Sequence, residues 1–273
     1  MTQLCTMMIT ADPGIAAHAV GAGLDMLFVD LERDGKAARQ GHLDTWKSPH
    51  VMADVARLRA AVPDARLMAR LNPWSDRSAE EVAAALDAGA DALMLPMFRS
   101  AEPVLRLRDA MGARAALIPL AETAGALAAL PQILQDAVPE QVHIGLNDLA
   151  LDMGAKFLFQ PLADGSLERP CAALRAAGVP FGIGGVARLG AGAVPAELVL
   201  GEHARLGSNW VILSRAFHDR ADTLATLRNG IDFGAELAAL RRCYAAWRRA
   251  SRPALEKNRA AFRNAVSVAS QQR

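Results

Sequence analysis

Residues 116–122 (ALIPLAE) and 141–148 (QVHIGLND) decide how this chain folds and where its chemistry lies. Each begins as a short apolar run, typical of a strand buried on both faces, and each ends on a carboxylate, Glu122 or Asp148. A carboxylate is costly at the end of a core strand unless its charge is compensated, and a divalent cation is a common answer. The two stretches therefore predict a parallel sheet with an acidic site at its edge.

Apolar runs of the same kind recur along the whole chain, and amphipathic stretches separate them. We expect strands at 4–10, 26–32, 66–72, 92–97, 116–122, 141–147, 179–185 and 209–215. We expect helices at 13–23, 49–62, 78–89, 101–112, 123–136, 167–177, 195–207 and 219–249. Eight strand–helix units in 273 residues favour an α/β fold with a single (β/α)8 TIM barrel over an open doubly wound sheet.

The pattern of elements suggests one catalytic domain and a short extension. We assign residues 1–250 to the barrel and 251–273 to a C-terminal helical tail, which is polar and basic after Pro253. The tail is expected to pack on the barrel or on a neighbouring subunit, with flexible outermost residues.

Composition narrows the class of protein. Hydrophobic residues make up 52% and charged residues 22%, with a net charge of +1, so nothing points to a nucleic-acid or acidic-membrane partner. The three cysteines form no CxxC pair, which argues against a disulfide framework or a zinc site. The N-terminus lacks the pattern of a signal peptide, and no apolar run is long enough to span a membrane. We expect a cytoplasmic protein.

Polar residues gather where the expected strands end. In a TIM barrel the catalytic residues come from the C-terminal ends of the strands. The residues expected at that rim are Asp30, Glu32, Arg70, Asn72, Pro96, Glu122, Asn147, Asp148 and Arg215.

Glu122 and Asp148 are the candidate metal ligands. They follow consecutive strands, which are neighbours in a barrel, so two anions there would repel unless a cation lay between them. Oxygen ligands suit Mg²⁺ or Mn²⁺. The alternative is that each residue caps the helix that follows it.

Arg70 is the candidate partner for a substrate carboxylate, because its planar guanidinium can donate two parallel hydrogen bonds to the anion. The alternative is an ion pair with Asp30 or Glu32 at the neighbouring strand end. Schiff-base chemistry needs a lysine presented from a strand, and none of the four lysines lies in an expected strand.

The histidines divide by their expected place in the barrel. His42 and His50 lie in the long loop after the second strand, at the active face. His143 falls inside a strand, where a satisfied core imidazole is the simpler interpretation. His18 and His203 fall on helices, and we expect them at the surface.

At these residues the sequence resembles the HpcH/HpaI aldolase and citrate-lyase β-subunit family, within the phosphoenolpyruvate/pyruvate superfamily. Five pieces carry the resemblance in order: FVDLERDGK (28–36), ARLNP (69–73), AGADALMLPMF (88–98), LAETAGAL (120–127) and HIGLNDLALDMG (143–154).

The resemblance implies roles for particular residues. Glu122 and Asp148 match the family's metal-binding carboxylates, and Arg70 matches the arginine that holds pyruvate or its enolate. The main chain of Gly145, Leu146 and Asn147 would face the substrate carboxylate, with Pro96 nearby. The implied reaction is reversible aldol cleavage of a 2-oxo acid to pyruvate and an aldehyde in a homo-oligomer.

The sequence departs from the family pattern at two positions. The aldolases usually carry a histidine base after the acidic residue of the second strand, and Arg33 stands there in this chain. An arginine stays protonated and cannot act as a base, so the proton would pass to water on the metal, to His42 or to another chain. Leu120 replaces a glutamine that many of these aldolases place near the metal water. Asp30 and Glu32 would orient Arg33, Arg70 or metal waters.

The residues and the resemblance together imply a metal-dependent carbon–carbon lyase acting on small-molecule 2-oxo acids. An Arg33 that held a second carboxylate would favour a dianionic partner such as oxaloacetate. A CoA-thioester lyase or an enzyme condensing an acyl-CoA with a 2-oxo acid is the alternative on the same site, with Arg33, Arg39, Arg188 and Arg215 as candidate CoA contacts. A barrel that binds a metabolite without catalysis is the third hypothesis.

Overall fold

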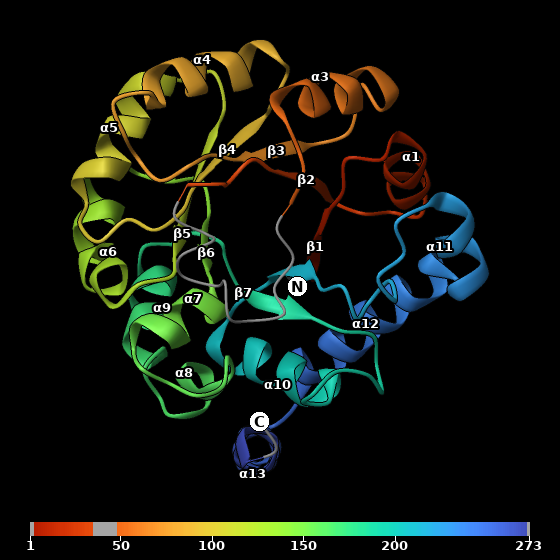
Figure 1. Ribbon diagram of the computed structural model, residues 1–273. Helices are drawn as coiled ribbons and strands as arrows, with labels where there is room; N and C mark the ends of the chain where they lie inside the picture. Colours follow the sequence, from red (N-terminus) through yellow and green to blue (C-terminus); the bar gives the residue numbers. More distant parts are fainter. Residues whose placement is uncertain (1–2, 35–47, 272–273) are drawn as a thin grey trace.

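A computed structural model describes residues 3–34 and 48–271 of the chain. Its eight described strands are all parallel and close into a barrel in chain order, with β8 pairing to β1 (Figure 1). The strands are β1 Cys5–Ile9, β2 Met26–Asp30, β3 Leu67–Arg70, β4 Ala92–Leu95, β5 Ala116–Ala121, β6 Val142–Ile144, β7 Phe181–Val186 and β8 Trp210–Leu213. The predicted TIM barrel is confirmed.

Helices surround the strands as a ring (Figure 1). They are α1 Pro13–Gly21, α3 Met52–Ala61, α4 Ser78–Asp87, α5 Glu102–Met111, α6 Ala124–Asp136, α7 Leu146–Asp152, α8 Gln160–Ala163, α9 Glu168–Ala176, α10 Ala196–Leu206, α11 Leu224–Gly230, α12 Phe233–Arg249 and α13 Arg252–Gln271. The described helices include α7 and α8, which were not predicted as helices, because each is too short to show a clear helical pattern in the sequence.

The prediction of one long helix over 219–249 is wrong. Ile231 has an extended backbone, with φ −150° and ψ 150°, and separates α11 from α12. Asp232 then caps the new helix, because its side chain accepts a hydrogen bond of 3.0 Å from the N–H of Ala235. In the sequence, Asp232 is the signal for this break, because aspartate is a preferred residue at the start of a helix.

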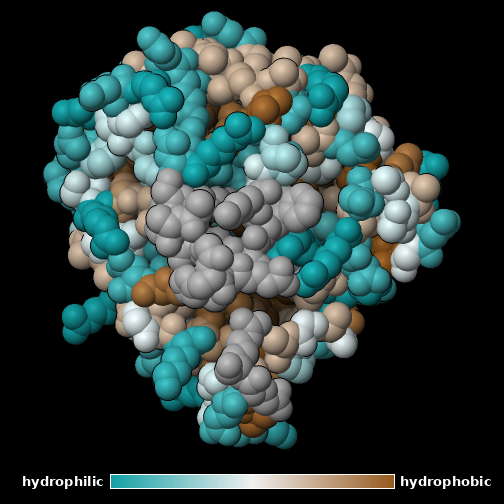
Figure 2. Space-filling model, viewed as in Figure 1, coloured by the Kyte–Doolittle hydropathy of each residue, from teal (hydrophilic) through white to brown (hydrophobic). Residues whose placement is uncertain are grey.

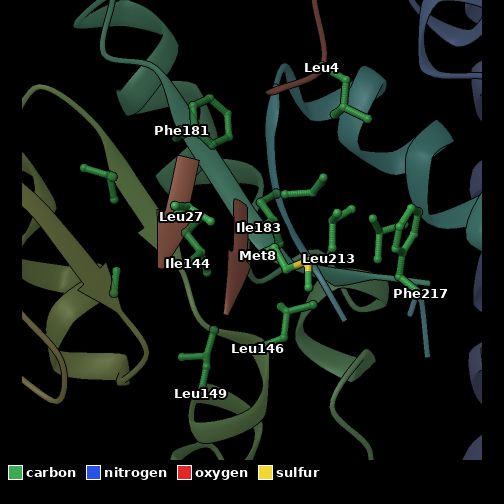
Figure 3. Close-up of a cluster of buried hydrophobic side chains, with 14 of the residues drawn as sticks. Leu4, Met8, Leu27, Ile144, Leu146, Leu149, Phe181, Ile183, Leu213 and Phe217 are labelled. Carbon is green, nitrogen blue, oxygen red and sulfur yellow. The ribbon is translucent and has the colours of Figure 1, made fainter. Parts of the chain in front are cut away.

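The strands bury apolar side chains on both faces. The outer face packs against the helices, and Figure 3 shows part of this layer around Leu27, Ile144, Ile183 and Leu213. The barrel interior holds a second buried cluster: Met7, Met26, Phe28, Met68, Ala92, Met94, Ile118, Leu120 and Trp210. Methionine fills irregular space well, so this interior supports the rim without a ring of branched side chains.

Strand register places the rim residues beside one another. Asp30 lies directly opposite Arg70 on the next strand. Both come two residues after the buried Phe28–Met68 pair, and so on the same face of their strands. Successive side chains of a strand alternate between its faces, so these two point into the barrel mouth. The register of β2 and β3 therefore brings a negatively charged and a positively charged side chain together.

Two predictions about individual residues are wrong. The strand expected at 141–147 ends at Ile144, because Gly145 caps α7 and Asp148 lies in the first turn of that helix. His203, expected at the surface, is fully buried on α10, and its Nδ1 lies 2.9 Å from the hydroxyl of Ser208. Burial lowers the pKa of His203 to about 3, so it is neutral in the folded protein.

The tail helix α13 packs on α10 and α8 of its own chain (Figure 1). Asn258 is buried there, and its Nδ2 donates to the carbonyl of Leu198 at 3.1 Å. Gly201 on α10 makes room for it: a Cβ at this glycine would lie 2.2 Å from Asn258 Nδ2. Arg259 pairs with Glu168 at 2.9 Å beside this contact.

On the face seen in Figure 2, hydrophobic residues are scattered rather than gathered in one patch. Within the described part of the chain, no helix is both long and apolar enough to cross a membrane.

Replacing Gly201 by alanine should separate α13 from α10, because the new methyl group would occupy the position of the Asn258 amide. We expect a loss of about 1–3 kcal/mol in the free energy of unfolding, measured by urea denaturation. Gly21→Ala in α1 is the matched control, since a Cβ there meets nothing within 4 Å. A Gly201→Ala variant as stable as the control would show that Asn258 does not hold the tail.

Candidate active site

The rim of the barrel is organised by an ion pair between Arg70 and Asp30. Arg70 donates from Nε to Asp30 Oδ1 at 2.8 Å and from Nη2 to Oδ2 at 2.7 Å. Glu32 Oε2 lies 3.5 Å from the same Nη2. Asp30 and Glu32 are 3% and 2% exposed as side chains, and Arg70 is 13% exposed. The ion pair that was the alternative for Arg70 is therefore present, and it fixes the guanidinium plane.

Arg70 retains a hydrogen-bond donor for a ligand. Within the described residues, its Nη1 donates to no partner, while Nε and Nη2 are both used. The guanidinium lies over the ring of Phe28, with 5.4 Å from Cζ to the ring centroid. Burial acts to lower the pKa of Arg70, but the charges of Asp30 and Glu32 outweigh it, so the pKa is raised and Arg70 stays cationic.

Glu122 follows β5 and is 3% exposed. Its Oε1 accepts a hydrogen bond of 3.1 Å from the N–H of Met97. Met97 follows Pro96 at the end of β4 and has a φ of 57°, the left-handed region that non-glycine residues rarely adopt. Burial raises the pKa of Glu122 well above its ordinary value; Arg70 opposes this, and the charges of Asp148 and Glu32 add to it.

Glu122 and the start of α7 are packed tightly together. A Cβ at Gly145 would lie 2.8 Å from Glu122 Oε2 and 2.9 Å from Glu122 Cβ, so only glycine fits. Asp148, three residues further in the first turn of α7, is 9% exposed and close enough for its charge to raise the pKa of Glu122. The charge of Asp148 therefore acts on Glu122 although Asp148 is on a helix.

The donor set at this rim suits a hard divalent cation. Asp30, Glu32, Glu122 and Asp148 are four buried carboxylates, and Arg70 is the single arginine that pairs with them in the described residues. No cluster of three or more His, Cys, Asp or Glu side chains in the described ranges is arranged as a complete metal site. Two carboxylates leave further positions for water or substrate, which is how Mg²⁺ is usually held. The residues fit such an ion.

Arg33 does not point its guanidinium at the rim acids. Its Nη2 donates to the carbonyl of His50 at 3.0 Å and lies 3.4 Å from that of Pro49. Its main-chain N–H donates to Asn72 Oδ1 at 2.8 Å. His50 in turn accepts the main-chain N–H of Asp30 on Nδ1, at 3.2 Å. His42 and Arg39 lie outside the described residues.

The other candidates lie around the same rim. Pro96 is buried directly after β4, and Leu120 is buried inside the barrel. Leu146 begins α7 with its side chain in the outer core (Figure 3), so only its main chain is available to a ligand. Asn147 is half-buried in the first turn of α7.

Two features of the rim had no clear signal in the sequence. The left-handed backbone of Met97 and the contact of His50 with Asp30 depend on tertiary placement. His143 points into the barrel with Leu120 and Gly182, its register partners. Burial lowers its pKa to about 4, and the charge of Arg70 adds to this, so it is neutral below the rim.

The stability of the metal-free protein should fall as the pH rises through the raised pKa of Glu122. The folded state binds this proton more tightly than the unfolded state, whose pKa is near 4.5, so the stabilisation is full at low pH and lost above the folded-state pKa. Glu122→Gln keeps an acceptor for Met97 and removes the charge. We expect this variant to be more stable than the wild type at high pH, by on the order of 1–3 kcal/mol.

Urea denaturation from pH 5 to pH 9, with EDTA or with Mg²⁺, measures this difference. Added Mg²⁺ should stabilise the wild type and leave Glu122→Gln unchanged, because binding to the folded state alone adds to stability. Parallel pH profiles for the two proteins would contradict a buried, strained Glu122.

Comparison with known proteins places this barrel in a family. The family model for HpcH/HpaI aldolase/citrate lyase matches residues 6–181. No curated protein sequence matches the chain.

Solved structures share the fold at low identity. An HpcH/HpaI aldolase/citrate lyase family protein from Burkholderia cenocepacia J2315 aligns with a TM-score of 0.60 and 20% identity, covering 90% of this chain and 95% of its own. An HpcH/HpaI aldolase from Desulfitobacterium hafniense DCB-2 gives 0.61 and 18%, over 85% and 95%. Citrate synthase SbnG gives 0.59 and 16%, over 88% and 94%. Because the family model covers well over half of the 273 residues, the chain belongs to the HpcH/HpaI aldolase/citrate lyase family.

Proposed function

We propose that this protein is a metal-dependent carbon–carbon lyase that forms or cleaves a pyruvate-like enolate from a 2-oxo acid, with an aldehyde as the second product. The observation that supports this best is Arg70, which Asp30 holds in a fixed plane beside the buried Glu122. A fixed cation beside a carboxylate pair is suited to an anionic substrate with an adjacent oxo group.

In this proposal Glu122 and Asp148 hold Mg²⁺ or Mn²⁺. The bound cation would supply Lewis-acid polarisation of the oxo group. Arg70 Nη1 would donate to the substrate and stabilise negative charge as it develops on the enolate oxygen. The first N–H groups of α7, at Leu146 and Asn147, have no partner within their helix and would face the substrate carboxylate. Pro96 would close the side of the site next to Glu122.

The proton that leaves the donor carbon needs an acceptor other than Arg33. Arg33 stays protonated, and its guanidinium is bonded to main-chain carbonyls. Water at the metal, His42 and a residue of a second chain remain the proposed acceptors. Asp30 and Glu32 orient Arg70 rather than accept this proton, because both lie against its guanidinium. We propose a cytoplasmic homo-oligomer as the working form.

A CoA-thioester lyase or a condensing enzyme is the second candidate. It is favoured by the likeness of the barrel to citrate synthase SbnG, whose name describes bond formation rather than cleavage. Such a reaction would use the same carboxylates and Arg70. Of the basic residues suggested for CoA, Arg33 is bonded to the loop main chain and Arg188 is half-buried after β7. Assays with citryl-CoA and malyl-CoA separate the two candidates.

Glu122→Ala should abolish metal binding and lyase activity together, because it removes one of two proposed ligands. Arg70→Lys should retain metal binding and lower kcat/KM by about 100-fold or more, since a lysine cannot reproduce the planar contact. Calorimetric titration with Mn²⁺ and a cleavage assay on 4-hydroxy-2-oxo acids measure both effects.

The surface pair on α5 provides matched controls. Glu102→Ala and Arg106→Lys change an exposed i,i+4 ion pair and should behave as the wild type. Full activity in Glu122→Ala would refute the proposed metal site. Loss of metal binding in Arg70→Lys would mean that Arg70 maintains the fold of the rim instead of binding substrate.

A further inference from the structure

β1 ends before it reaches the main-chain N–H of Asp30, and no other described strand lies on that side of β2. β1 ends at Ile9, and the last bond on that side runs from the Thr10 N–H to the Phe28 carbonyl, at 3.2 Å. Parallel strands direct their hydrogen-bonding groups to alternate sides, so Asp30 presents its N–H to the same side as Phe28. His50 fills this vacant pairing position, accepting the N–H on Nδ1 at 3.2 Å.

This contact fixes the protonation of the His50 ring. Because Asp30 donates, Nδ1 must present its lone pair, and the neutral imidazole carries its hydrogen on Nε2. Protonation of Nδ1 would point its N–H at the main-chain N–H of Asp30, and the hydrogen bond between the two residues would be lost. His50 is buried, at 8% exposed. The ring is therefore an acceptor for the strand and is not free to take a proton at Nδ1.

Asp30, whose main chain is held by His50, in turn holds the side chain of Arg70. Its Oδ1 accepts from Arg70 Nε at 2.8 Å and from the main-chain N–H of Glu32 at 3.2 Å. Its Oδ2 accepts from Arg70 Nη2 at 2.7 Å. Any shift of the Asp30 main chain therefore moves the plane of the guanidinium that faces the site.

Arg33 holds the main chain that carries the His50 ring. Its Nη2 bonds to the carbonyl of His50 at 3.0 Å, and its own N–H is held by Asn72 at 2.8 Å. Asn72 is anchored by its Nδ2, which donates to Glu81 at 2.7 Å. Arg33 thus links the end of β2 to residues 49–50 with a charge-assisted bond to a carbonyl.

We propose that His50 and Arg33 are positioning residues for Arg70: Arg33 holds the main chain at His50, and the neutral His50 ring holds the main chain of Asp30. Arg33 then serves the site through this link and not by gripping a second substrate carboxylate. This inference rests on the proposed function, in which Arg70 binds the 2-oxo acid. We therefore expect the substrate of this protein to make one carboxylate contact at the rim, with Arg70, and none with Arg33.

Variants at position 50 separate positioning from proton transfer. His50→Asn places an amide oxygen close to the position of Nδ1, so it keeps the acceptor for Asp30 and cannot act as a base. His50→Ala removes the acceptor, and His50→Gln places its oxygen one atom too far. The binding of oxalate, a mimic of the enolate of pyruvate, is measured by calorimetry at saturating Mg²⁺, together with kcat and KM.

Positioning predicts that His50→Asn stays within about threefold of the wild type in both readouts. His50→Ala and His50→Gln should each lose about tenfold in oxalate affinity, as expected for one lost hydrogen bond at a fixed group. His18→Asn on α1 is the matched control and should have no effect. A His50→Asn variant as defective as His50→Ala would overturn the inference, because it would show that the ring itself contacts the reacting atoms.

Variants at position 33 test the second half of the proposal. Arg33→Met should weaken oxalate binding by about tenfold, with Arg106→Met on α5 as the unaffected control. The loss should be equal for substrates with one and with two carboxylates. An effect confined to dicarboxylic substrates would overturn the positioning role of Arg33.

The tautomer of His50 is measured without any substrate. Two-bond proton–nitrogen NMR spectra of the wild type, with the His50 signals identified by their loss in His50→Asn, should show Nδ1 without a proton and Nε2 with one. A protonated Nδ1 would overturn the inference whatever the enzyme does. A wild type with this tautomer that binds no oxalate with metal would instead contradict the proposed function.

Discussion

The bidentate ion pair between Asp30 and Arg70 sets the geometry of the barrel rim. The two residues are register partners on adjacent strands, so the pair forms as soon as β2 and β3 align. A buried ion pair is weak evidence for stability, because desolvation offsets much of the attraction. The ion pair instead fixes the orientation of Arg70: the guanidinium is held in one plane, and its Nη1 faces no described acceptor.

Four buried carboxylates gather at the rim of the barrel, and Arg70 lies against two of them. Asp30 and Glu32 both lie against Arg70, while the pKa of Glu122 is raised by burial and by the charge of Asp148. Gly145 leaves room for this carboxylate, since a Cβ there would lie 2.8 Å from Glu122 Oε2. An arrangement that raises the pKa of a buried acid costs free energy in the absence of a cation. This cost explains why we expect metal binding and stability to be coupled.

The barrel and much of its rim were predictable from the sequence. Apolar runs of four to six residues identify strands buried on both faces, and the polar residue after each run marks the rim. An ion pair of Arg70 with Asp30 or Glu32 was the alternative to a substrate-binding role, and the structure contains it. Asp148 was placed at the rim but on a strand, because VHIG continues the apolar pattern and only Gly145 marks the change to a helix.

Other features depend on contacts between distant segments. His203 lies on α10, whose sequence pattern is that of a surface helix, yet its side chain is fully buried and bonds to the hydroxyl of Ser208. The sequence offered both His50 and His42 in the loop after β2, and the role of His50 emerges from the hydrogen bond that it accepts from the Asp30 N–H. The sequence allowed Arg33 to bind a substrate carboxylate, but in the structure its guanidinium donates to the carbonyl of His50. Sequence patterns identify the buried strands well, and contacts between separate segments poorly.

Deuterium exchange at the methyl group of pyruvate, followed by proton NMR in D2O, tests the proposed enolate chemistry most directly. The wild type should exchange these protons only with Mg²⁺ or Mn²⁺ present, at a rate above that of Glu122→Ala. Absence of exchange with either metal would contradict the claim that this rim forms a pyruvate enolate, and would move the search for substrates to oxaloacetate and acyl-CoA compounds.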